Sequence, residues 1–210
     1  MHEGLNPGAV STVLIPTSTW WRVFHRSHGP LGFNGTEQGN SRFSPLRDSE
    51  GTIIPTLYCG SSTKVALMES VLHDVPSPSD RFIYFSPSHS EEEREIAGIQ
   101  NAKTLLLADF STVGLRRLGL TRGQVVDSGK PDYPATRMLA QWLYLNRPDV
   151  QGIRWTSRQL DLGQVIVLFE PRLAPDTISV QLPGESIALE RWQDEILELV
   201  IALGGGLKQG

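Results

Sequence analysis

Alternating apolar and polar residues predict a strand over 20–25, in which Arg22 shares one face with the aromatic side chains of Trp20 and Phe24. Such an arginine either lines a ligand pocket or only packs its aliphatic stem against the rings. A second strand, 56–59, is bounded by proline and glycine. Further predicted strands are rich in Val, Leu, Ile and Phe, and cover 81–87, 105–110, 150–156 and 164–170.

Apolar residues at helical spacing predict four helices. The first covers 62–73 and places Glu69 at the edge of its apolar face, roughly 40° from Val65 when each residue turns by about 100°. The second covers 111–118 and has Ser111 as its cap. The third covers 134–145 and is expected to place Met138, Leu139, Trp142 and Leu145 in the core. The final helix has an apolar stripe formed by Leu189, Trp192, Ile196, Leu199, Val200 and Leu203.

The order of these elements predicts a single α+β domain. Segment 1–19 is rich in Gly, Pro, Ser and Thr and is expected to be an extended arm, and 204–210 follows as a tail that begins with three glycines. The domain itself is assigned to 20–203. The charge run 91–95 is expected to be a solvated helix or loop.

Composition narrows the function classes. The 210 residues carry a net charge of −4, which argues against direct, non-specific binding to nucleic acid. The single cysteine, Cys59, cannot form an internal disulfide, and its place in a buried-looking strand favours packing over a reactive role. No signal-like start and no apolar run approaching a membrane span is present, so the expected location is the cytoplasm, without membrane association.

Candidate chemistry concentrates between residues 33 and 74. This stretch supplies Arg42, Tyr58 and Glu69 from three consecutive elements, with turn-forming residues between them. On residue types alone, these side chains indicate a possible pocket for an anionic ligand. Each also has a plainer interpretation, since such an arginine or glutamate is often only solvated and such a tyrosine often only packs. The spacing matches no general motif such as a phosphate-binding loop or a zinc-binding pair of histidines.

The segments GPLGFNG, SRFSPL, IPTLYCG and VALMESVLHDV resemble the RES domain family, which is named for its arginine, glutamate and serine. The resemblance places the family's arginine–aromatic turn at Arg42 and Phe43, its tyrosine at Tyr58, and its glutamate and histidine at Glu69 and His73. It extends from about Trp20 to Phe169. Trp21-Arg22-Val23 is similar to the family's opening strand, and Gly152 to Arg158 is similar to the strand that ends in its serine, here Ser157. Asn40 and Ser41 depart from the family by replacing two glycines.

This resemblance implies a fold similar to that of the ADP-ribosyltransferases, with NAD as the substrate and no metal. It implies Glu69, Arg42 and Tyr58 as catalytic residues, and Arg22, Arg42, Tyr58, Ser157 and His73 as residues that hold NAD. In these roles Glu69 stabilises the cationic ribose, Arg42 or Arg22 binds the pyrophosphate, Tyr58 stacks on nicotinamide, and Ser157 contacts the carboxamide or a ribose. Neither Glu69 nor Arg42 is expected to lie deep in the core.

The function implied is that of an NAD glycohydrolase, the toxin of a toxin–antitoxin pair. Its expected partner is an Xre-type antitoxin with a helix-turn-helix domain, in a complex of several chains. Transfer to phosphate, as in an NAD phosphorylase, or to a protein side chain, as in a protein ADP-ribosyltransferase, remains open because all three reactions break the same bond. A catalytically inactive NAD-binding or nucleotide-binding module is the alternative from another class.

Overall fold

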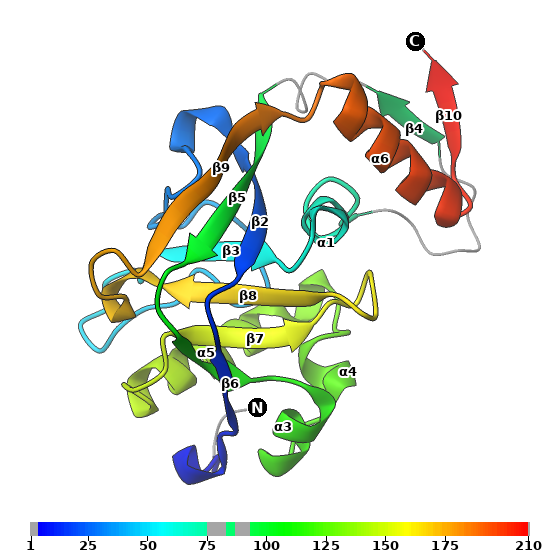
Figure 1. Ribbon diagram of the computed structural model, residues 1–210. Helices are drawn as coiled ribbons and strands as arrows, with labels where there is room; N and C mark the ends of the chain where they lie inside the picture. Colours follow the sequence, from blue (N-terminus) through cyan, green and yellow to red (C-terminus); the bar gives the residue numbers. More distant parts are fainter. Residues whose placement is uncertain (1–3, 75–82, 87–92, 210) are drawn as a thin grey trace.

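The computed structural model describes residues 4–74, 83–86 and 93–209. Its centre is an eight-stranded sheet in the order β1-β6-β7-β8-β3-β2-β5-β9 (Figure 1). The strands are β1 (Thr12–Ile15), β2 (Thr19–His25), β3 (Thr56–Gly60), β5 (Arg94–Asn101), β6 (Leu105–Asp109), β7 (Gly152–Thr156), β8 (Gln164–Phe169) and β9 (Ile178–Ser186). A separate parallel pair joins β4 (Ile83–Ser86) to β10 (Gly206–Gln209).

The sheet has a seam between β2 and β3. Neighbouring strands pair antiparallel except for β6 and β7, yet β2 and β3 share only one registered pair, Trp21 opposite Gly60. In Figure 1, β2, β5 and β9 consequently run steeply across the direction of β3, β8 and β7. A glycine is required at the seam, because a Cβ at Gly60 would lie 2.8 Å from the backbone nitrogen of Ala66.

Helices form two groups, one on each half of the sheet (Figure 1). Near β6 and β7 lie α3 (Thr112–Arg117), α4 (Arg122–Val125) and α5 (Tyr133–Asn146), and beside β2 and β5 lie α1 (Thr63–Met68) and α6 (Glu190–Ala202). Short 3-10 turns occur at η1 (Pro7–Ala9), η2 (Arg26–His28), η3 (Lys130–Asp132) and η4 (Glu170–Arg172). Within the described ranges, no helix has both the length and the apolar character needed to cross a bilayer.

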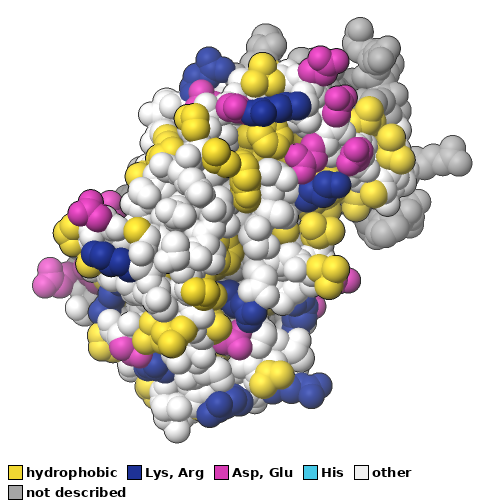
Figure 2. Space-filling model, viewed as in Figure 1, with side chains coloured by type: hydrophobic (Ala, Val, Ile, Leu, Met, Phe, Trp, Pro, Cys, Tyr) yellow, Lys and Arg dark blue, Asp and Glu magenta, His cyan; other side chains and the backbone are white. Residues whose placement is uncertain are grey.

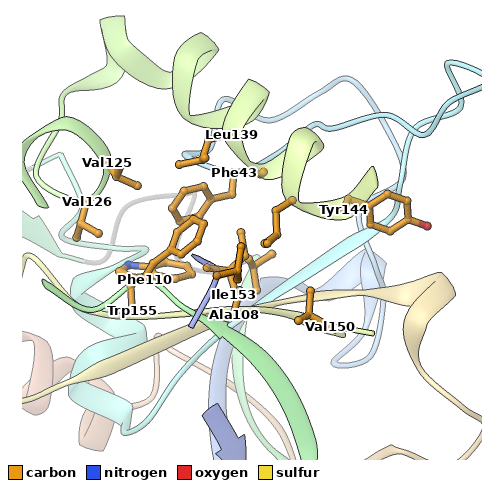
Figure 3. Close-up of a cluster of buried hydrophobic side chains, with 14 of the residues drawn as sticks. Phe43, Ala108, Phe110, Val125, Val126, Leu139, Tyr144, Val150, Ile153 and Trp155 are labelled. Carbon is orange, nitrogen blue, oxygen red and sulfur yellow. The ribbon is translucent and has the colours of Figure 1, made fainter. Parts of the chain in front are cut away.

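Each helical group has its own buried cluster. The larger cluster lies between α5 and the strands β6, β7 and β8, and its loop-borne member Phe43 inserts beneath Leu139 of α5 (Figure 3). There the Phe43 ring lies edge-on to Phe110 and Trp155, with centroids 5.7 and 5.1 Å away. The second cluster packs α1 and α6 against Ile96 of β5. Phe43 therefore anchors the loop that carries its neighbour, Arg42, to the core.

Most strands and helices predicted from periodicity are confirmed. The expected strands over 20–25, 56–59, 105–110, 150–156 and 164–170 correspond to β2, β3, β6, β7 and β8. The helix over 111–118 is α3, capped by the Ser111 hydroxyl, and the helix over 134–145 is α5. Of the strand predicted over 81–87, Ile83–Ser86 form β4, and the remainder lies outside the described residues.

Two helix predictions need correction. The helix predicted over 62–73 ends at Met68, because the Ser70 hydroxyl takes the carbonyl oxygen of Ala66 that the next helical N–H would have used. In α5 the buried face is turned away from Met138 and Leu145, which are 51% and 44% exposed. The side chains that face the core are instead Tyr133, Thr136, Leu139, Ala140, Leu143 and Tyr144.

Three segments have more strand than the pattern indicated. Arg94 and Glu95, predicted to lie in a solvated helix or loop, begin β5. Within the expected arm 1–19, Thr12–Ile15 form the edge strand β1 against β6. Within the expected tail, Gly206–Gln209 form β10.

Candidate functional site

A cavity of about 300 Å³ lies at the seam of the sheet. This volume is within the range of small-molecule sites. Trp21 and Gly60, the registered pair between β2 and β3, both line it. Its polar and charged lining comprises Arg22, Asn40, Ser41, Arg42, Tyr58, Glu69, Ser70, His73, Asp74, Lys130 and Tyr133. The structure therefore brings together five of the six predicted site residues, with Ser157 directly behind them.

Glu69 and Ser157 form the most specific pair at this site. Glu69 follows the last residue of α1, and its carboxylate accepts a hydrogen bond of 2.6 Å from the Ser157 hydroxyl, just beyond β7. The same hydroxyl oxygen accepts the backbone N–H groups of Gln159 and Leu160, at 3.0 and 3.1 Å. A hydroxyl can donate only one hydrogen bond, and Ser157 donates it to Glu69. The fully buried Ser157 therefore orients the carboxylate from behind.

The backbone that carries Ser157 is itself fixed by Arg122 of α4. The two terminal nitrogens of Arg122 donate to the carbonyl oxygens of Thr156 and Ser157, at 3.3 and 3.2 Å. Its Nε lies 3.0 Å from the carboxylate of Asp127, which holds the guanidinium in place. Sequence reasoning missed this support, because an arginine on a short polar helix resembles any solvated one.

Arg42 is buried, which contradicts the expectation that it lies outside the deep core. Its Nη1 donates to the carbonyl oxygens of Val125 and Ser128, at 2.8 and 3.0 Å, and to the Ser128 hydroxyl at 2.7 Å. The guanidinium also lies over the Tyr133 ring, 5.0 Å from its centroid. Burial lowers the pKa of Arg42 from its ordinary value. The side chain is thus preorganised at the cavity wall by backbone carbonyls on one side and an aromatic face on the other.

Tyr58 holds the Arg42 loop. Its hydroxyl oxygen accepts the backbone N–H of Phe43 at 3.1 Å and is 3.1 and 3.4 Å from the hydroxyls of Ser41 and Ser44. Burial raises the pKa of the phenol, so it remains neutral well into the alkaline range. The hydroxyl therefore connects the residues on both sides of Arg42 to β3.

Asn40 and Ser41, which replace the family's two glycines, make contacts in the same loop. Arg137 of α5 hydrogen-bonds to the side chain of Asn40 and donates from Nε to the carbonyl oxygen of Ser41 at 3.0 Å. The Ser41 hydroxyl in turn contacts Tyr58. Asn40 and Ser41 thus supply side-chain contacts that glycines lack.

Arg22 reaches the cavity, but its head group also supports a turn. Its two terminal nitrogens donate to the carbonyl oxygens of Pro30 and Gly32, at 2.8 and 2.7 Å. Burial lowers its pKa. Of the two alternatives raised by the sequence, the structure supports the first, since Arg22 lines the cavity. Its guanidinium carbon also lies over the Phe24 ring, 5.8 Å from the centroid.

A chain of polar contacts runs along the rim of the cavity. Nδ1 of His73 is 2.8 Å from Asp74, whose second oxygen accepts from Lys130 Nζ at 2.7 Å. Nε2 of His73 is 3.4 Å from the Tyr133 hydroxyl. Of these four residues, sequence reasoning identified only His73. Tyr133 was missed because Pro134 marks the start of a helix there, and nothing in the local pattern shows that the preceding side chain faces a cavity.

The remaining candidates carry no chemistry at the site. Cys59 is buried and its pKa is raised to about 12 by burial, so its thiol stays protonated at neutral pH. Among the described residues, no group of three or more His, Cys, Asp or Glu side chains is arranged to hold a metal ion.

Charge is unevenly distributed over the surface. On the face shown in Figure 2, acidic side chains gather over α6, whereas Lys and Arg are scattered and interspersed with other side chains. The acidic residues of α6 are Glu190, Asp194, Glu195 and Glu198. The described part of this face therefore lacks the continuous basic stripe typical of nucleic-acid binding.

Comparison with known proteins agrees with this architecture. Residues 19–190 match the model of the RES domain, so the chain belongs to the RES domain family. The fold is similar to that in the crystal structure of the M. tuberculosis MbcT–MbcA toxin–antitoxin complex, with a TM-score of 0.61 and 15% identity over 90% of this chain and 93% of that chain. No curated protein sequence matches the chain.

Proposed function

We propose that this protein is an NAD-degrading enzyme that cleaves the bond between nicotinamide and ribose and transfers the ADP-ribose to water. The observation that carries the proposal is the Glu69 carboxylate, which faces the cavity while Ser157 holds it from behind at 2.6 Å. Cleavage of this bond develops positive charge on the ribose, as glycoside cleavage does. An oriented carboxylate stabilises that charge because it is in place before the bond breaks.

The other cavity residues have complementary roles in this reaction. Arg42, held by three hydrogen bonds from Nη1, turns its remaining donors to the pyrophosphate or a ribose. The rings of Tyr58 and Trp21 offer apolar faces for nicotinamide, which leaves as a neutral molecule with the bonding electron pair. Water then attacks the ribose carbon and gives its proton to Glu69, which acts as the base.

We further propose that the chain is the toxin of a toxin–antitoxin pair, with a fold of the ADP-ribosyltransferase type. Membership of the RES domain family and similarity to a structure that contains a toxin and its antitoxin support this assignment. An enzyme that consumes NAD in the cytoplasm requires restraint, which an Xre-type antitoxin would supply by covering the cavity.

The decisive test incubates the purified protein with NAD, with and without phosphate, and separates the products by chromatography. Hydrolysis yields nicotinamide and ADP-ribose in both samples. A phosphorylated ADP-ribose that appears only with phosphate would identify a phosphorylase, and labelled protein would identify a transferase. If NAD stays intact while the protein binds it, the module is an inactive binder. Expression without an antitoxin should lower cellular NAD and stop growth.

A further inference from the structure

The rim of the cavity contains a cation that differs from the two arginines. Arg22 and Arg42 both donate from terminal nitrogens to backbone carbonyl oxygens. These carbonyl groups belong to a turn and to a helix end, so they hold the two guanidinium groups in place. Among the described residues, the Lys130 ammonium instead contacts one side chain, Asp74, at 2.7 Å. The ammonium has three donors, and the half-exposed Lys130 side chain lines the cavity, so it can donate to a ligand there as well as to Asp74.

The partner of Lys130 is also exposed to solvent. The Asp74 side chain is 66% exposed, and among the described residues its carboxylate contacts Lys130 and His73. Exposed ion pairs of this kind contribute little net stability, because water solvates both charges when they separate. Exchange of the carboxylate for another anion at Lys130 is therefore energetically easy.

We propose that Lys130 is a specificity residue of the cavity that binds a phosphate oxygen of the ligand, with Asp74 as its counter-ion in the free protein. This inference rests on the proposed function for the identity of the ligand, a dinucleotide with an anionic pyrophosphate. Asp74 then competes with the ligand for the ammonium and also repels the phosphate. The two residues have opposite effects on affinity for an anion.

A purely structural ion pair makes a different prediction. If Lys130 and Asp74 only hold η3 against the segment that follows α1, then loss of either partner loosens the rim in the same way. The two substitutions would then change ligand affinity in the same direction. The signs of the two effects, rather than their sizes, separate the two roles.

The experiment measures ADP-ribose binding by calorimetry in the full chain. Lys130→Met should weaken binding about tenfold, as expected for the loss of one hydrogen bond to a charged group, whereas Lys130→Arg should retain most of the affinity. Asp74→Asn, which keeps an acceptor for Lys130 but removes the charge, should tighten binding. Lys103→Met, at an exposed lysine bound to the Pro175 carbonyl, is the matched control and should bind like the wild type.

Three outcomes overturn the inference. The first is weaker binding in both Lys130→Met and Asp74→Asn, the second is a wild-type affinity in Lys130→Met, and the third is absence of ADP-ribose binding to the wild type. NAD turnover, measured on the same samples, tests the proposed function separately. Binding that depends on Lys130 without any NAD cleavage would leave the inference intact and refute the proposed enzyme activity.

Discussion

The Ser157 hydroxyl donates to the Glu69 carboxylate over 2.6 Å, although 88 residues separate the two in the chain. This contact joins the end of β7, in one half of the sheet, to the end of α1, beside the other half. Glu69 is the C-cap of α1 and keeps a helical backbone conformation, and its side chain lines the cavity.

Glu69→Gln separates catalysis from binding. The amide keeps an oxygen that accepts the hydrogen bond from the Ser157 hydroxyl, so the fold and the NAD affinity should change little. Turnover should fall about a hundredfold or more, because the negative charge that stabilises the cationic ribose is lost. Measured kcat and the dissociation constant of NAD test this split. Glu198→Gln, at an exposed glutamate paired with Lys64, is the matched control. Retained activity in Glu69→Gln would place the catalytic carboxylate elsewhere.

Ser157→Ala should reduce both stability and turnover. The substitution removes the acceptor for the part-buried N–H groups of Gln159 and Leu160, and each such group left without a partner costs up to about 1–3 kcal/mol. Turnover falls because Glu69 loses its orienting donor. Urea unfolding and steady-state kinetics on the same preparation measure the two effects. A variant with normal stability and no activity would instead indicate direct contact between Ser157 and the ligand.

Periodicity predicted two kinds of strand. One kind has one buried and one partly exposed face, and the other is a short apolar run between turn-forming residues. β5 was missed because its charged start hides four consecutive buried residues, Ile96 to Ile99, which show no alternation. β9 was missed because Pro183 and Gly184 indicate a turn. It pairs with β5 through register shifts on either side of Gly98, where a Cβ would lie 3.0 Å from Leu182. Local pattern cannot reveal a strand that depends on such a partner.

The candidate site was predictable where residue type and family resemblance coincide. Arg42, Tyr58 and Glu69 were identified in this way, and the structure places all three around one cavity. What the sequence could not reveal is which atoms of a side chain are already engaged. The contacts of Arg42 with Val125 and Ser128 join segments more than 80 residues apart, so no local pattern records them.

Tyr58→Phe tests whether this tyrosine positions Arg42. Phenylalanine keeps the ring but removes the oxygen that accepts the Phe43 N–H and contacts Ser41. The loop that carries Arg42 should loosen, and we expect a loss of about 1–3 kcal/mol in the free energy of unfolding together with a higher KM for NAD. Tyr144→Phe, at a ring packed edge-on against Phe169, controls for loss of a tyrosine hydroxyl elsewhere in the same core. Unchanged stability in Tyr58→Phe would leave ring contact with the ligand as the role of Tyr58.

Cys59 should make the protein less stable in alkali. Burial raises the pKa of its thiol from 9.0 to about 12, so the unfolded chain loses this proton at a lower pH than the folded chain does. Its contribution to stability is complete below pH 9 and declines as the pH rises from there toward 12. Between pH 8 and pH 10, linkage gives a loss of about 1.4 kcal/mol from this one group.

The comparison of wild type with Cys59→Ala isolates that loss. Alanine leaves a small cavity, which lowers the stability by the same amount at every pH. It also removes the only thiol in the chain, and with it the pH-dependent contribution of Cys59. Urea unfolding at pH 8 and pH 10 should therefore show a smaller decrease for the variant than for the wild type, by about 1.4 kcal/mol. The other groups that titrate in this range, including Tyr58, are common to both proteins and cancel in the difference. Equal decreases in the two proteins would mean that the Cys59 thiol ionises as readily in the folded chain as in the unfolded one, and that water reaches it from the cavity, which Cys59 lines.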